Sequence, residues 1–228
     1  MNNNFSDIKA CVFDAYGTLF DVHSAAAQHS HKLGKLEQSV SEMWRSKQLQ
    51  YTWLRSLMND YDEFWTITGD ALDYALASHG VEDGELRTNL MNAYLQLSCF
   101  EEVPRVLKAL KDSGMKTAIL SNGSPNMLDP VVANSGVASY IDACISVDSV
   151  KIFKPAAVVY QLACDQLGVG ANEVSFQSSN CWDAIGAAHF GFQVVWCNRY
   201  GQQLDRLPAR PQAEVKDLDA LPALVGVA

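Results

Sequence analysis

Asp14 is the first residue in the chain whose position suggests chemistry. It follows the apolar run of residues 8–13 and is followed closely by Gly17. A short apolar run that ends in a glycine turn is typical of a buried strand in a parallel sheet, and open α/β sheets bind ligands at the carboxyl ends of such strands. Because Asp is also a common turn residue, Asp14 alone leaves two interpretations open: a reactive carboxylate and a plain turn residue.

Two later expected strands, residues 116–120 and 173–177, also end in polar segments. These segments carry Ser121, Asn122, Gly123, Ser178, Ser179 and Asn180. The carboxyl ends of parallel strands meet at one edge of a sheet, so we expect these residues and Asp14 to face one crevice. Ser and Asn are also favoured helix caps, which leaves a capping role open for Ser178 and Asn180.

Strand and helix patterns alternate after residue 99, which predicts an α/β fold with a doubly wound parallel sheet. In addition to the strand at residues 8–13, we expect strands near residues 116–120, 141–147, 173–177 and 193–197. We expect helices near residues 103–113, 127–134 and 182–190, another helix with Pro155 in its first turn, and a polar tail after residue 197.

Residues 19–98 show helical patterns and no convincing strand. We expect helices near residues 41–54, 61–79 and 85–97. On the first of them, Arg45 and Leu49 are four residues apart and share a face. The chain therefore divides into an α/β core of residues 1–18 and 99–228 and an all-α insertion of residues 19–98.

The composition excludes several classes of protein. The net charge of −9 opposes binding to nucleic acid or to anionic membrane surfaces. No apolar run approaches the roughly 18 residues that span a bilayer. The six cysteines are scattered without a C-x-x-C pair, which predicts neither a zinc knuckle nor a disulfide framework. Residues 1–4 lack the pattern of a secretory signal, so we expect a cytoplasmic protein.

Four motifs, taken in order, resemble those of the haloacid dehalogenase-like superfamily. They are Asp14-Ala15-Tyr16-Gly17-Thr18, Ser121-Asn122-Gly123, Lys154-Pro155 and Ser178-Ser179-Asn180-Cys181-Trp182-Asp183. With Trp44-Arg45 and Lys47-Gln48-Leu49 in the insertion, the chain resembles the L-2-haloacid dehalogenases, the type II dehalogenase branch. The resemblance covers nearly the whole chain. It implies a Rossmann-like core, a helical cap subdomain and a homodimer.

Tyr16 separates this branch from the phosphatases of the superfamily, which resemble D-x-D-x-T. Their second Asp supplies acid–base catalysis, whereas a phenol with a reference pKa of about 10 is a poor replacement. Lys154 would supply positive charge without a metal, so the resemblance implies no metal and no cofactor. Asp183 keeps a Mg²⁺-dependent phosphatase as an alternative, and a non-catalytic, carboxylate-binding dimeric protein is a second alternative.

The resemblance implies hydrolysis of L-2-haloalkanoic acids to 2-hydroxy acids with inversion. Asp14 would displace the halide to form an ester, which water then hydrolyses. The implied catalytic residues are Asp14, Thr18, Arg45, Lys154, Tyr160, Ser178, Asn180 and Asp183. The implied substrate-binding residues are Tyr16, Leu49, Phe64, Ser121, Asn122 and Trp182.

Within that set, Ser121, the Asn122 region and Lys154 would hold the substrate carboxylate. Arg45 would receive the halide, alone or together with Asn122, and Asp183 would activate or orient the hydrolytic water. Plain structural roles remain open for several members. Tyr160 fits a helix–sheet interface equally well, and Phe64 and Trp182 fit a hydrophobic core.

Overall fold

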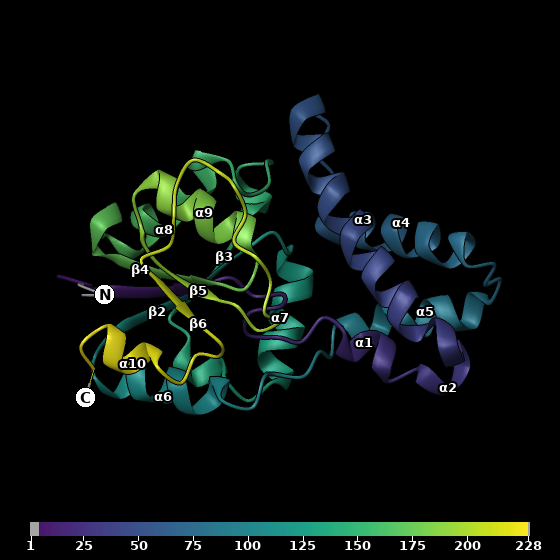
Figure 1. The fold of residues 1–228 in the computed structure, drawn as a ribbon, viewed down its shortest axis with the longest axis horizontal. Coiled ribbons are helices and arrows are strands. Elements are labelled where there is room, and N and C mark those ends of the chain that lie inside the picture. Colours follow the sequence, from purple (N-terminus) through teal and green to yellow (C-terminus); the bar gives the residue numbers. More distant parts are fainter. Residues whose placement is uncertain (1–4, 228) are drawn as a thin grey trace.

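A single parallel sheet forms the centre of the protein (Figure 1). The computed structural model describes residues 5–227, so residues 1–4, on which the localisation prediction rests, lie outside the described part. The strand order is β3-β2-β1-β4-β5-β6, and every neighbouring pair is parallel. The strands are β1 (Ala10–Phe13), β2 (Lys116–Ser121), β3 (Ala143–Ser146), β4 (Val174–Ser178), β5 (Gln193–Cys197) and β6 (Ala213–Val215).

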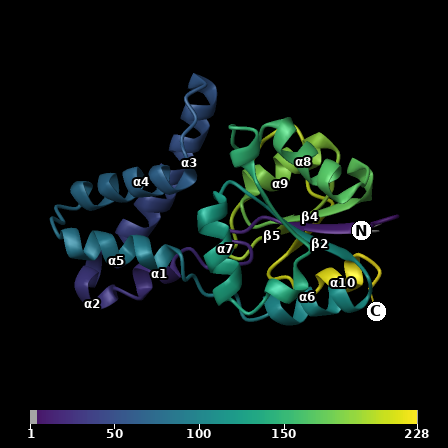
Figure 2. The same cartoon turned by 180° about the vertical axis from the view of Figure 1, so that it is seen from behind.

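Helices cover both faces of this sheet, as the doubly wound prediction requires (Figures 1 and 2). The core helices are α6 (Val103–Asp112), α7 (Pro125–Asn134), α8 (Ala157–Leu167), α9 (Cys181–Phe190) and α10 (Leu221–Leu224). Helices α8 and α9 lie on one face, and α6 and α10 lie on the other. Buried Val103, Val106, Leu107 and Leu110 recur at helical spacing, which gives α6 one apolar side for the sheet.

Strand β1 lies in the middle of the sheet, and all four of its residues are fully buried. Phe13 is in register with Ile119 of β2 and with Gln177 of β4. The carboxyl ends of these three strands are therefore adjacent, so the predicted meeting of their polar ends at one edge is confirmed.

The structure differs from two expectations about the second half of the chain. Helix α8 begins at Ala157 with Ala156 as its N-cap, so Pro155, which follows a cis peptide bond, precedes the helix instead of lying in its first turn. The expected polar tail contains β6 and α10. Both are too short, at three and four residues, to show a clear period in the sequence.

The insertion folds as a separate helical lobe, which confirms the predicted cap (Figure 1). Its helices are α1 (Ser24–Ala27), α2 (Ser30–Leu33), α3 (Glu37–Met58), α4 (Phe64–Ser78) and α5 (Gly84–Tyr94). Helices α3 and α4 pack together, and Trp44 Nε1 of α3 donates to the carbonyl of Thr68 in α4 at 2.8 Å. Within residues 5–227, no helix combines the length and the apolar character needed to cross a membrane.

The chain leaves the core and returns to it at adjacent points. Phe20 and Cys99 form an antiparallel bridge. The amide of Asp21 donates to the carbonyl of Ser98 at 2.9 Å. These contacts support the division into residues 1–18 and 99–228 against 19–98, which stays a prediction.

A buried ion pair lies next to the two points at which the chain passes between the core and the cap. Arg199 Nη2 donates to Glu102 Oε1 at 2.6 Å and to the carbonyl of Thr18 at 2.8 Å. The guanidinium lies 3.7 Å from the centre of the Phe100 ring. Glu102 Oε1 also accepts from the amide of Leu218 at 3.3 Å. Arg199 therefore joins the loop after β1, the returning chain and the C-terminal segment.

We predict that Arg199→Met lowers the free energy of unfolding by about 3–5 kcal/mol, because it leaves the Glu102 carboxylate buried without its cation. Urea denaturation measures this loss. Arg105→Met is the matched control, since the Arg105–Asp219 pair is half exposed and is worth about 0–1 kcal/mol. Equal losses in the two variants would contradict the prediction.

Candidate active site

Asp14 lies directly after β1 and accepts three hydrogen bonds. Its Oδ1 accepts from Lys154 Nζ at 3.0 Å. Its Oδ2 accepts from Asn180 Nδ2 at 2.8 Å and from Thr18 Oγ1 at 3.1 Å. The carboxylate is thus held by one cation and two neutral donors, which fix both of its oxygens.

The direction of the Thr18 bond follows from its other partner. The amide of Ser179 donates to Thr18 Oγ1 at 2.8 Å, so the hydroxyl proton of Thr18 is left for Asp14. Ser179 follows β4, and its carbonyl accepts from Trp196 Nε1 of β5 at 3.2 Å. The position of Thr18 is therefore set by the ends of β4 and β5.

Lys154 lies between two carboxylates and is almost fully buried, with 1% of its surface exposed. Its Nζ donates to Asp14 Oδ1 and to Asp183 Oδ2, each at 3.0 Å. Burial lowers the pKa of Lys154, but the charges of Asp14 and Asp183 outweigh it, so this pKa lies above its ordinary value. The ammonium is therefore charged at neutral pH.

Asp183 lies in the first turn of α9 and is fully buried. Its Oδ1 accepts from Tyr160 Oη at 2.8 Å, and its Oδ2 faces Lys154. Burial raises the pKa of Asp183, and the negative charge of Asp14 adds to the rise, while Lys154 and Tyr160 oppose it. The net shift is upward, which makes this carboxylate a stronger base than an ordinary Asp.

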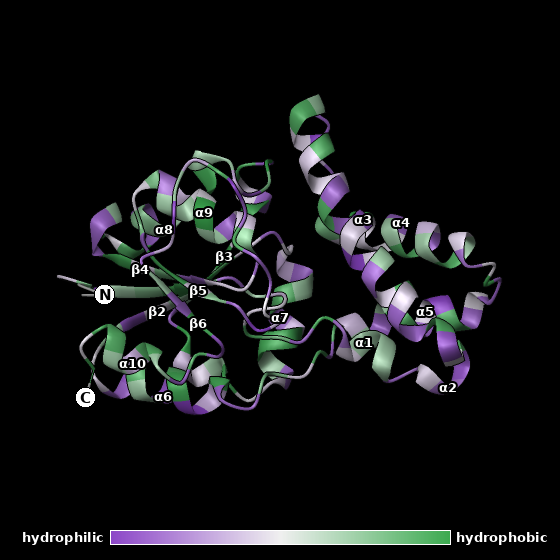
Figure 3. Cartoon of the chain, in the orientation of Figure 1, coloured by the Kyte–Doolittle hydropathy of each residue, from purple (hydrophilic) through white to green (hydrophobic). Residues whose placement is uncertain are grey.

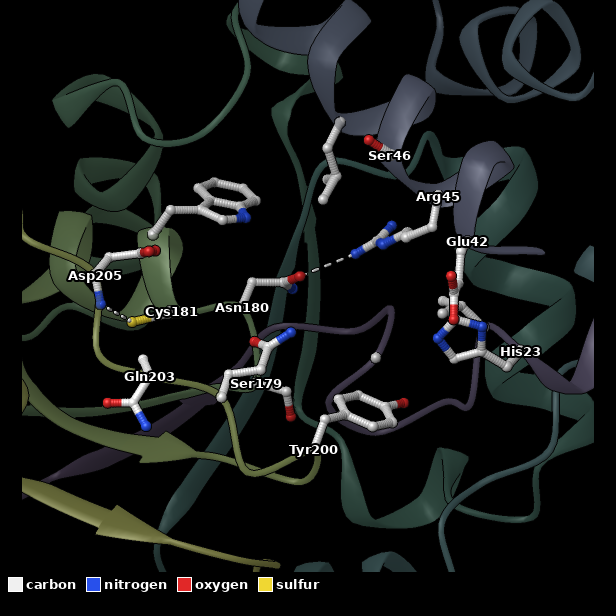
Figure 4. Close-up of a pocket in the computed structure, with 15 residues that line it drawn as sticks. His23, Glu42, Arg45, Ser46, Ser179, Asn180, Cys181, Tyr200, Gln203 and Asp205 are labelled. Atoms are coloured by element: carbon white, nitrogen blue, oxygen red, sulfur yellow. Dashed lines mark hydrogen bonds between the residues drawn. The ribbon is translucent and has the colours of Figure 1, made fainter. Parts of the chain in front are cut away.

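Arg45 reaches the core from helix α3 of the cap. Its Nη2 donates to the carbonyl of Tyr16 at 3.1 Å and to Asn180 Oδ1 at 3.2 Å, and its Nη1 donates to Gln48 Oε1 at 2.6 Å. Figure 4 shows the bond from Arg45 to Asn180 across the space between the two lobes. Asn180 occupies the N-cap position of α9 without making a side-chain capping bond, and instead links Arg45 to Asp14.

These groups surround a small, partly open cavity. Its lining residues are Asp14, Tyr16, Arg45, Leu49, Phe64, Ser121, Asn122, Lys154, Asn180 and Trp182. Its volume of about 10 Å³ has room for roughly one water molecule. A larger organic acid can therefore enter only if the walls move.

A wide cleft between cap and core opens next to this cavity (Figure 4). The cleft has a volume of about 750 Å³. It shares Arg45, Leu49, Asn180 and Trp182 with the cavity. Separation of Arg45 from Asn180 would join the two spaces, which makes the cleft the natural approach to Asp14.

Tyr16 forms one wall of the cavity and depends on a nearby glycine. A Cβ on Gly123 would lie 2.7 Å from Tyr16 Cε2, closer than carbon atoms approach. The ring stacks on Tyr94, with 5.4 Å between ring centres. Burial raises the pKa of the Tyr16 phenol well above its ordinary value. Its hydroxyl is buried and has no hydrogen-bond partner in the part of the chain that the structure describes.

The structure brings the residues that sequence analysis selected into one place, while their individual roles stay predictions. All six expected substrate-binding residues line the cavity, as do Asp14, Arg45, Lys154 and Asn180. Thr18, Tyr160 and Asp183 do not line it but bond to groups around Asp14 and Lys154. Ser178 is set further back: in the described chain its hydroxyl bonds only to the main chain of Asn180.

Three residues hold this set in place, and none of them was given a supporting role from the sequence, although Gln48 and Ser179 lie inside the quoted motifs. Gln48 supports Arg45, and Ser179 and Arg199 support Thr18. Gln48 carried a usable signal, because a polar residue three positions after Arg45 shares its helix face. Ser179 carried one as well, because it lies in the polar segment that follows an expected strand, whereas Arg199 carried none. Within residues 5–227, the site included, no three His, Cys, Asp or Glu side chains are grouped as metal ligands.

Comparison with known proteins assigns the chain to a family. Residues 8–191 match the model of the haloacid dehalogenase-like hydrolases. The chain is 45% identical to (S)-2-haloacid dehalogenase 1 of Pseudomonas sp. strain CBS-3, over 96% of each chain. It also resembles the structure of L-2-haloacid dehalogenase from Xanthobacter autotrophicus with chloropropionic acid covalently bound. That structure is 38% identical, has a TM-score of 0.90, and the match covers 97% of this chain and 100% of that one. The chain therefore belongs to the haloacid dehalogenase-like hydrolases, within the group of the L-2-haloacid dehalogenases.

Proposed function

We propose that the protein hydrolyses L-2-haloalkanoic acids to 2-hydroxy acids with inversion at C2, through an ester on Asp14 and without a metal. The observation that carries the proposal is the small cavity that Asp14 lines together with apolar side chains and Arg45. The relative with covalently bound chloropropionic acid supports the same chemistry.

Ser121 and Asn122 suit the substrate carboxylate because each has a free donor. Ser121 Oγ accepts from the amide of Gly123 at 3.0 Å, and Asn122 Oδ1 accepts from the amide of Lys154 at 3.0 Å. Within residues 5–227, no acceptor takes the Ser121 hydroxyl proton or the Asn122 amide protons. These donors would hold the acid with C2 against Asp14, and such positioning lowers barriers strongly.

We assign the attack to Asp14 Oδ1, because Thr18 and Asn180 then stay on Oδ2, where charge develops in the hydrolysis step. Attack forms the Oδ1–C2 bond and breaks the carbon–halogen bond, with the electron pair leaving on the halide. Backside attack inverts C2. Arg45, on the cap side of the cavity, would receive the halide.

Water then attacks Cγ of Asp14, and negative charge develops on Oδ2. Thr18 and Asn180 already donate to this oxygen, so they form an oxyanion hole for the hydrolysis step. Asp183, with its raised pKa, would accept the proton of the water. Collapse of the intermediate breaks the Cγ–Oδ1 bond, and the leaving alkoxide takes back the proton held by Asp183. The released 2-hydroxy acid keeps the original Oδ1, and loss of the remaining hydroxyl proton to solvent restores the Asp14 carboxylate with one oxygen from water.

The donor set argues against the phosphatase alternative. Lys154 Nζ lies 3.0 Å from an oxygen of Asp14 and from one of Asp183, so an ammonium already neutralises the two carboxylates that a divalent cation would need. These residues do not fit Mg²⁺ well. The Tyr16 phenol, whose pKa lies well above its ordinary value, is not an acid–base catalyst near neutral pH.

A homodimer is the proposed assembly, and the end of α3 is its proposed interface. This end extends beyond both lobes and carries apolar surface (Figures 1 and 3). Leu57 is 81% exposed and Met58 is 68% exposed, and Leu54 is also exposed. A second copy of the same helix offers a matching apolar face.

The function is tested by halide release from L-2-chloropropionate. We expect release in the presence of a strong chelator at the same rate as without it, because no step requires a metal. Asp14→Asn should lower the rate on the order of 10⁴-fold or more, since the nucleophile is lost. A single turnover in ¹⁸O-labelled water should place the label in the Asp14 carboxylate.

Other outcomes would support the alternatives. Loss of activity on chelation, together with hydrolysis of p-nitrophenyl phosphate, would favour the phosphatase. Tight binding of a 2-haloacid without halide release would favour the non-catalytic reading. Label in the first 2-hydroxy acid, and not in Asp14, would mean direct attack by water.

We predict that Tyr160→Phe moves the acid limb of ester hydrolysis to higher pH by about 1–2 units. The hydroxyl of Tyr160 stabilises the ionised form of Asp183, so its removal raises the pKa of Asp183 further. Only ionised Asp183 accepts a proton, so activity is lost sooner as the pH falls. The decay rate of the ester, measured against pH, reports the shift. Tyr74→Phe, at the cap surface, is the control, and equal profiles for the two variants would refute the role of Tyr160.

We predict that Leu57→Glu converts the dimer to a monomer, because it places a charge on the apolar end of α3 in both copies. Sedimentation velocity gives the mass directly. Lys35→Glu, on an exposed residue elsewhere in the cap, should leave the mass unchanged. A wild-type protein that sediments as a monomer at high concentration would end this proposal.

A further inference from the structure

Gln48 is a fully buried polar residue in the cap, directly behind Arg45. Its Oε1 accepts from Arg45 Nη1 at 2.6 Å and from Tyr94 Oη at 3.1 Å. Its Nε2 donates to Thr68 Oγ1 at 2.7 Å. A buried amide is costly unless it is hydrogen-bonded. Here both ends of the amide are bonded, to residues of three different cap helices.

The orientation of this amide is dictated by α4. Thr68 Oγ1 donates its only proton to the carbonyl of Phe64 at 2.6 Å, so it can only accept from Gln48. Nε2 must therefore face Thr68, and Oε1 must face the guanidinium. If the amide were reversed, its NH₂ group would face the N–H donors of Arg45. Its oxygen would then face Thr68 Oγ1, which has no proton left to donate.

Arg45 is held entirely by neutral acceptors. Its partners are Gln48 Oε1, the carbonyl of Tyr16 and Asn180 Oδ1. Four other arginines form ion pairs with Asp or Glu: Arg55, Arg87, Arg105 and Arg199. Within residues 5–227, Arg45 has no carboxylate at ion-pair distance. Its position is therefore fixed while its positive charge is not paired.

We infer that Gln48 is a positioning residue that sets the halide affinity of the site, by orienting Arg45 through a neutral acceptor. The inference rests on the proposed function, because it deepens the role given to Arg45. A halide is weakly basic and has to compete with the acceptors already on the guanidinium. A carboxylate in place of Gln48 would bind the Arg45 guanidinium more strongly than a halide does. A neutral amide orients the guanidinium and leaves its positive charge available to the halide.

The test is Gln48→Glu, which keeps the shape of the side chain and adds a negative charge. Bromide inhibition of L-2-chloropropionate hydrolysis is measured at fixed ionic strength. We expect the inhibition constant for bromide to rise about tenfold or more, because the new carboxylate pairs with Arg45. The halide-forming step should slow, while hydrolysis of the ester, which does not use Arg45, should not.

The chain offers a matched control on the same helix. Gln50 is exposed, and its Oε1 accepts from Lys47 Nζ at 2.9 Å, which repeats the cation–amide spacing of Arg45 and Gln48. Gln50→Glu should leave bromide inhibition unchanged. Thr68→Val removes the acceptor that orients the Gln48 amide without adding charge, and it should weaken bromide inhibition by a smaller factor.

The outcomes separate this inference from the proposed function. A wild-type protein that releases no halide overturns the proposed function. A wild-type protein that turns over, with folded Gln48→Glu showing unchanged bromide inhibition, overturns the inference alone. If Gln48→Glu does not fold, unchanged bromide inhibition in Thr68→Val overturns it instead. Circular dichroism and urea denaturation establish which variants are folded.

Discussion

The rest of the site depends on the Lys154 ammonium, which is buried between the carboxylates of Asp14 and Asp183. Two buried carboxylates repel each other and have lost their hydration, so both need a cation and further donors. Thr18 and Asn180 supply the donors for Asp14, and Tyr160 supplies one for Asp183. These groups come from four segments that must therefore meet at one point: the ends of β1 and β4, the segment before α8 and the start of α9. A parallel sheet with β1 at its centre brings these segments together.

The two cations of the site, Lys154 and Arg45, differ in whether a carboxylate balances their charge, and this difference suits them to different roles. Lys154 faces two carboxylates, so its charge is largely compensated and serves to hold Asp14 in place. Arg45 comes from the cap and faces only neutral acceptors. The proposed role of Arg45 as the group that receives the halide is consistent with this difference, because its charge has no carboxylate partner within the described chain.

The parts of the site that could be predicted are those in which a rule links neighbouring residues to a shared sheet edge or helix face. Asp14 and Ser121 follow apolar runs, and parallel strands bring such ends together. Arg45 and Leu49 share a face because a helix repeats every 3.6 residues. The positions of Pro155 and of β6 were missed, since neither a loop before a helix nor a three-residue strand has a period. The support of Gln48 by Thr68 and Tyr94 joins residues 20 and 46 positions apart, and only the packing of the cap brings these together.

Closure of the cap is linked to the state of the nucleophile through Asn180. Its amide nitrogen donates to Asp14 and its oxygen accepts from Arg45, so one side chain connects the cap to the reacting carboxylate. The cavity has room for about one water, so we expect the contact between Arg45 and Asn180 to open when the substrate enters. All three hydrogen bonds on Asp14 are present in this structure together with that contact. The carboxylate is therefore already oriented by the chain itself, and the cap bears on that orientation through the one side chain that contacts both.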